Sequence, residues 1–198
     1  MSIFASILRS VYKLSGAKKA FALPEDALRK EIEKQNRHRG VFTPTDHKAY
    51  YETIAAHNNA QPEPLLQPRH IVVVSPGEVP WNDAEKARMQ ALNKRDVSID
   101  YAFMVTVEKI MRHGCENVPD YMLSGSRGDF TGVGDIHFFY SADEVLYGAL
   151  PDFEEACKRA NVPYTVSARP KMVHCYCMLP IFKEAKEDFA KIVDILKK

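Results

Sequence analysis

Two adjacent carboxylates, Asp143 and Glu144, follow an apolar run, and His174 comes thirty residues after Glu144. The run, residues 135–140, is typical of a strand buried on both faces, so the carboxylates stand where that strand ends. A carboxylate next to a histidine holds the imidazole in one tautomer and stabilises its charged form. The pattern therefore predicts the acid and the base of a nucleophile–histidine–acid triad.

The elements that must position these groups alternate between strands and helices. Apolar patterns predict strands at residues 70–75, 136–140 and 164–168, and helices at 83–93, 99–111, 150–160 and 182–196. This order favours right-handed βαβ crossovers and a parallel sheet of about three strands, which is the α/β class. Working groups in such sheets gather at the carboxyl ends of the strands, so we expect His174 to meet the carboxylates there.

The amino-terminal part of the sequence has a different character. Apolar residues at helical spacing predict helices over 3–14 and 27–39, and three prolines fall within residues 62–68. The sequence thus divides into a helical segment (1–57), a proline-rich junction (58–69) and an α/β part (70–198).

Composition excludes several classes of protein. The chain has 27 basic and 26 acidic side chains among 198 residues, so nothing indicates a nucleic-acid partner. It has no run of eighteen apolar residues, and therefore no predicted membrane span. The first residues lack the features of a signal peptide, and the four cysteines are not spaced as a disulfide framework, so we expect a cytoplasmic protein.

Several segments together resemble one family. They are Gly128–Gly132 (GDFTG), Phe138–Leu146 (FFYSADEVL), Ala160–Pro163 (ANVP) and Arg169–His174 (RPKMVH), with Ile71–Pro76 and Asn93–Asp96 upstream. They resemble the hormone-sensitive-lipase-like α/β-hydrolases, the acetyl esterase and carboxylesterase group. This resemblance implies a partial α/β-hydrolase fold with an amino-terminal helical cap. It also implies a carboxylic-ester hydrolase (esterase or lipase) lineage, a small acyl-ester substrate or ligand, and no cofactor.

The resemblance also implies roles for individual residues. His174 matches the general base of the family. Glu144 matches the acid best, because the family acid stands two residues before the leucine that Leu146 matches. Asp143 is the alternative acid.

The sequence departs from the family in its middle. It contains neither G-x-S-x-G, which supplies the serine nucleophile, nor an H-G-G-G-like stretch, which supplies the oxyanion amides. At about 30 residues per βαβ unit, roughly a hundred residues are missing between the helical start and Ile71. We therefore expect impaired catalysis, with a non-catalytic ligand- or protein-binding remnant as the alternative.

The missing part also has a structural consequence. It would leave the first strand at an unpaired sheet edge, which predicts a homodimer through that edge or a cover formed by residues 41–66.

Other residues have the chemistry of nucleophiles or metal ligands. Ser75 is followed by Pro76 and is interpreted as a polar cap. The remaining nucleophile candidates are Ser124, Ser126, Cys175 and Cys177. A thiol next to its base in sequence is expected not to align with it. His113, Cys115, His174 and Cys177 fit no common zinc spacing, so no metal site is predicted.

Overall fold

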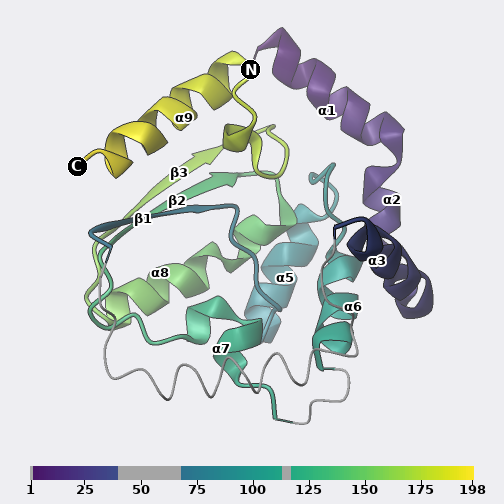
Figure 1. Cartoon of the computed structure of the whole chain (residues 1–198), viewed down its shortest axis with the longest axis horizontal. Helices are drawn as coiled ribbons and strands as arrows, with labels where there is room; N and C mark the ends of the chain where they lie inside the picture. Colours follow the sequence, from purple (N-terminus) through teal and green to yellow (C-terminus); the bar gives the residue numbers. More distant parts are fainter. Residues whose placement is uncertain (1, 40–67, 113–116) are drawn as a thin grey trace.

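The computed structural model describes residues 2–39, 68–112 and 117–198. Its centre is a parallel sheet of three strands, β1 (His70–Val74), β2 (Asp135–Ser141) and β3 (Tyr164–Arg169), in the order β1-β2-β3. His70 is paired with Asp135, and Ile136 with Tyr164. The parallel sheet and its strand number confirm the α/β prediction (Figure 1). Four of the six strand ends differ from the predicted ones by one residue, and the other two agree.

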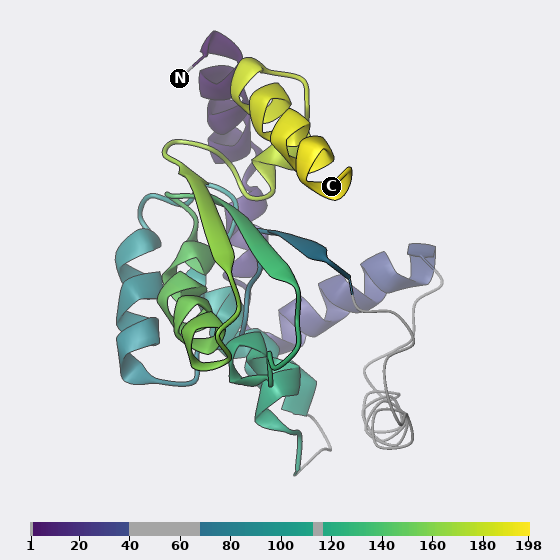
Figure 2. The ribbon, with the colours of Figure 1, turned by 90° about the vertical axis from the view of Figure 1, so that its left-hand side faces the viewer.

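Helices cover both faces of the sheet (Figure 2). One face packs against α5 (Asp83–Leu92), α6 (Tyr101–Arg112) and α8 (Leu150–Arg159), and Phe138 and Tyr140 of β2 are fully buried in this core. The opposite face packs against α9 (Lys183–Leu196), where Phe139 lies in a second core with Ile192. Alternate residues of β2 thus serve opposite cores, which explains its continuous apolar sequence.

Residues 2–39, the described part of the amino-terminal segment, form three helices, α1 (Ile3–Ser15), α2 (Ala17–Phe21) and α3 (Glu25–Arg39), where the sequence predicted two. Gly16 ends α1 in the left-handed region, at φ 71°, and α2 begins directly after it. This is a common use of glycine after a helix. The backbone amide and hydroxyl of Ser2 donate to Glu184 of α9, which fixes the start of α1 against the carboxyl-terminal helix.

The described residues also contain short elements that the sequence pattern did not predict. They are α7 (Asp120–Leu123) and the 3-10 turns η2 (Gly125–Arg127), η3 (Val145–Ala149) and η4 (Tyr176–Met178). The expected cover of the sheet edge by residues 41–66 lies outside the described residues, as does nearly all of the junction 58–69. Within the described residues, no helix combines the length and apolar character needed to cross a membrane.

Turn η3 follows Glu144 directly and is held very close to α5. A Cβ atom built on Gly148 would lie 2.8 Å from the backbone nitrogen of Met89 and 3.0 Å from its Cα. Only glycine allows this approach. The packing of α5 on η3 therefore holds in place the segment that directly follows Glu144.

We expect Gly148→Ala to lower the free energy of unfolding by about 1–3 kcal/mol, because the added methyl group meets backbone that cannot move aside. Urea unfolding followed by circular dichroism measures this. Gly125→Ala is the matched control, since its nearest neighbour would be the Phe153 ring at 3.4 Å. Equal stability of the two variants would show that η3 and α5 pack more loosely than described.

Candidate functional site

Glu144 and His174 meet at the carboxyl edge of the sheet, as their positions in the sequence predicted. Glu144 follows β2, and His174 lies in the loop after β3. His174 Nδ1 lies 2.8 Å from Glu144 Oε2. The hydrogen bond leaves Nε2 as the nitrogen available for chemistry.

The carboxylate of Glu144 is 1% exposed and is surrounded by donors. Its Oε1 accepts hydrogen bonds from Ser75 Oγ at 2.8 Å and from the backbone amide of Ser141 at 3.0 Å. Burial raises the pKa of Glu144 above its ordinary value, and the hydrogen bonds from His174, Ser75 and Ser141 act against that rise. Hydrogen bonds therefore fix both carboxylate oxygens of Glu144, and the bond to Oε2 sets the orientation of the His174 ring.

Asp143, the alternative acid, has different partners. Its side chain accepts from Arg95 Nε at 3.1 Å and from the backbone amide of Lys171 at 3.1 Å, and it lies 3.5 Å from the guanidinium of Arg9 in α1. These contacts join the loop after β2 to α1 and to the loop after β3. Of the two carboxylates, Glu144 is the one that the structure pairs with His174.

The second ring nitrogen of His174 faces a thiol. Cys175 Sγ lies 3.2 Å from His174 Nε2, so the expectation that adjacent residues would not align is wrong. The reason is the backbone at Cys175, which is left-handed with φ 53° and turns the side chain back toward the ring. The Cys175 amide also donates to Ser75 Oγ at 3.1 Å, which ties the cysteine to the carboxylate network.

The charge state of His174 follows from these contacts. Burial disfavours the imidazolium, but the hydrogen bonds to Cys175 and Glu144 outweigh burial and raise the pKa of His174 to about 10. At neutral pH the ring is therefore protonated, with one N–H directed at the carboxylate and the other at sulfur.

The other nucleophile candidates lie elsewhere or have different partners. Ser75 donates to the acid, and its φ of 45° places it in the left-handed region just past β1. Ser124 donates to the carbonyl of Val79, and Ser126 donates to Glu78. Cys177 is fully buried, and burial raises its pKa to about 12. The metal ligands considered in the sequence included His113 and Cys115, which lie outside the described residues.

Two residues that sequence analysis did not single out support the histidine loop. The amide of His174 donates to Ser98 Oγ at 3.2 Å. Asp96, also buried, accepts from the amides of Ser98 and of Val145, the residue after Glu144. Asp96 is the last residue of the Asn93–Asp96 stretch, which resembles the family. Its place in that stretch is the sequence feature that could have identified it as a supporting residue.

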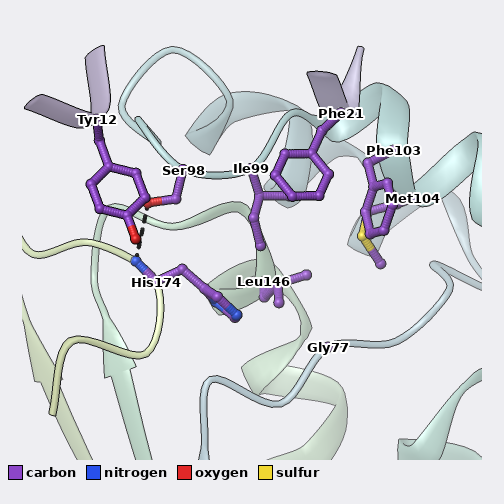
Figure 3. A pocket seen from close by; sticks show the side chains of 9 residues that line it. All are labelled: Tyr12, Phe21, Gly77, Ser98, Ile99, Phe103, Met104, Leu146 and His174. Carbon is purple, nitrogen blue, oxygen red and sulfur yellow. Dashed lines mark hydrogen bonds between the residues drawn. The ribbon is translucent and has the colours of Figure 1, made fainter. Parts of the chain in front are cut away.

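A cavity of about 430 Å³ opens beside His174 (Figure 3). Tyr12 of α1 and Phe21 of α2 reach into it from the amino-terminal helices, and Phe103 and Met104 reach in from α6. Its remaining lining residues are Gly77, Ser98, Ile99 and Leu146. The walls are mainly apolar, and the volume suits a small ligand with an apolar chain.

Comparison with known proteins gives no match to a family model and none to a curated protein sequence. Solved structures do match. An esterase from the bacterial hormone-sensitive lipase family superposes with a TM-score of 0.56 at 20% identity, over 72% of this chain and 46% of that one. A hormone-sensitive lipase from a metagenome library gives 0.58 at 18% identity, over 73% and 48%. EstE7, a hormone-sensitive-lipase homologue also from a metagenome library, gives 0.57 at 17%, over 73% and 48%.

The chain has a partial α/β-hydrolase fold. It spans about half the length of the esterases that it matches. The fold implied by the sequence resemblance is thereby confirmed, and at these identities the comparison speaks for the fold alone.

This partial α/β-hydrolase fold also buries a second carboxylate pair, Glu78 and Glu85, that sequence analysis did not identify. Glu78 accepts from the amide and hydroxyl of Ser126, each at 2.7 Å. Glu85 accepts from the amide of Trp81 at 3.0 Å. Burial, and then the charge of Glu78, raise the pKa of Glu85 to about 8 from an ordinary 4.5, and burial also raises the pKa of Glu78.

The raised pKa of Glu85 predicts a loss of stability as pH rises. Between pH 4.5 and about 8 the unfolded chain releases a proton that the folded chain keeps, so the free energy of unfolding falls across that window. One proton gives at most about 1.4 kcal/mol per pH unit. Urea unfolding at several pH values measures the slope.

Glu85→Gln removes this proton and should flatten the slope, whereas Glu155→Gln, an exposed change on α8, should leave it as in the parent. Parallel pH profiles for the parent and both variants would contradict a protonated Glu85 in the folded chain.

Proposed function

We propose that this chain is a thiol-dependent member of the ester-hydrolase lineage, in which Cys175 is the nucleophile, His174 the base and Glu144 the orienting acid. The observation that carries the proposal is the pair of contacts made by one imidazole, 2.8 Å to Glu144 and 3.2 Å to Cys175 Sγ. A nucleophile, a base and an orienting group in this order are the parts that acyl transfer requires.

The reaction begins with a small acyl ester in the cavity beside His174. His174 carries the proton of the Cys175 thiol on its ring. The sulfur then attacks the ester carbonyl carbon and forms a C–S bond. The C–O bond to the alcohol then breaks, and His174 returns the proton to the departing oxygen. The products of this half-reaction are an acyl thioester on Cys175 and a free alcohol.

The second half-reaction is expected to be slow. Water must attack the thioester with His174 as base, and the tetrahedral intermediate needs donors for its oxyanion. The sequence has no H-G-G-G-like stretch to supply them, and loss of one such donor in a serine protease costs about 10²–10³ in kcat. Impaired turnover with an accumulating acyl thioester is therefore the expected behaviour.

The apolar cavity itself favours a second candidate, a non-catalytic binder of small acyl ligands. Its walls would hold an acyl chain whether or not chemistry follows. The cytoplasmic location and the homodimer through the β1 edge also remain predictions.

Purified chain mixed with p-nitrophenyl acetate should release about one equivalent of p-nitrophenolate in a burst, followed by a slow phase. Mass spectrometry should find one acetyl group on Cys175. Cys175→Ala and His174→Gln should each slow the burst by about 10²-fold or more, because both nucleophile and base are needed.

Cys177→Ala is the matched control, since the pKa of about 12 keeps that buried thiol protonated and its loss should leave the burst intact. Acetylation of a different residue, or an unchanged burst in Cys175→Ala, would refute the assignment. Binding of p-nitrophenyl butyrate without acylation would instead favour the binder.

A further inference from the structure

The opposite end of the sheet carries a second group of chemically active side chains. His70 begins β1, Asp135 begins β2, and their Cα atoms are paired in the register. His137 lies two residues after Asp135, so its side chain is on the same face of the sheet. Phe139, two residues after His137, packs with Ile192, so this is the face that α9 covers (Figure 2). His70 and Asp135 begin their strands, whereas His174 follows the end of β3, so the two groups lie at opposite ends of the sheet.

The three side chains converge on one point. His137 Nε2 lies 3.4 Å from His70 Nδ1, and His70 Nδ1 lies 3.7 Å from Asp135 Oδ2. One ligand atom from each residue lies within 4.8 Å of the other two. Two ligands of a tetrahedral zinc ion, each about 2.0 Å from the metal, lie about 3.3 Å apart, so the separation of the two nitrogens is that of a ligand pair.

A neighbouring hydroxyl orients one of the imidazoles. His137 Nδ1 lies 2.8 Å from Thr165 Oγ1 on β3, its register partner. When Nδ1–H donates to this oxygen, the lone pair of Nε2 faces His70. Metal-bound histidines usually donate their other ring N–H in this way.

Charge and access also suit a cation at this place. Asp135 supplies a carboxylate oxygen beside the two imidazoles. The Asp135 side chain is 45% exposed, so an ion reaches the group from solvent.

We propose that His70, Asp135 and His137 form a binding site for zinc or a similar divalent transition metal. Two imidazoles and one carboxylate supply three ligands and leave a fourth position for water. His137 also lines a cavity of about 370 Å³, together with Asp194 and Lys191. Bound metal links the start of β1 to β2 and stabilises the folded chain, because the unfolded chain does not hold the ligands together. The site is independent of the acyl-transfer proposal.

Isothermal titration of untagged Cys175→Ala chain with zinc chloride tests the site, and this background removes the thiol beside His174 as a competing ligand. We expect one equivalent to bind, with a rise in the melting temperature. His70→Ala and His137→Ala should each abolish this binding. Thr165→Val should weaken it by about 10–100-fold, because it removes only the orienting hydroxyl.

Asp135→Asn provides a further test that leaves the strand's shape intact, and it should also weaken binding. His174→Ala on the same background should bind zinc like its parent. Circular dichroism must show each variant folded for its result to count. Absence of binding by the Cys175→Ala chain, or equally tight binding by folded His70→Ala and His137→Ala chains, would overturn the proposal.

Discussion

The site depends on a buried carboxylate. An ionised side chain taken out of water is strongly destabilising unless hydrogen bonds satisfy it. Glu144 meets this requirement with donors from three places, Ser75 at the exit of β1, Ser141 at the end of β2 and His174 after β3. Since these positions come together only when all three strands are paired, the parallel sheet and the acid–histidine pair form as one unit.

The amino-terminal helices complete what the sheet begins. Arg9 of α1 donates to the carbonyl of Met172 at 3.2 Å. Its guanidinium also lies 3.5 Å from the carboxylate of Asp143, in the loop after β2. Tyr12 and Phe21 then provide the outer wall of the cavity beside His174. A half-length α/β-hydrolase fold thus holds both an acid–histidine pair and an open, mainly apolar cavity beside it.

Much of the fold followed from the sequence because its signals are local. Continuous apolar runs identified the strands, and helical spacing identified the long helices. The pairing of Glu144 with His174 was predicted because parallel strand ends share an edge. Helix α2 was not predicted, since its five residues are too few to show helical spacing.

The remaining features depend on geometry that a sequence does not display. Cys175 was expected not to align with His174 because adjacent side chains usually diverge, and its left-handed backbone brings the two side chains together. The cluster of His70 and His137 requires the strand register, and the pair of Glu78 and Glu85 requires the packing of α5 against a loop. In the last two cases the decisive contact joins segments whose relative position no local pattern specifies.

Both contacts of the imidazole, to Glu144 and to Cys175, hold His174 as an imidazolium. Nitrogen-15 NMR of the labelled imidazole across pH 6–11 measures this charge state. We expect both ring nitrogens of His174 to stay protonated until about pH 10, and Cys175→Ala to lower this midpoint. A neutral ring at pH 7 in the parent chain, or a midpoint unchanged by Cys175→Ala, would contradict this expectation.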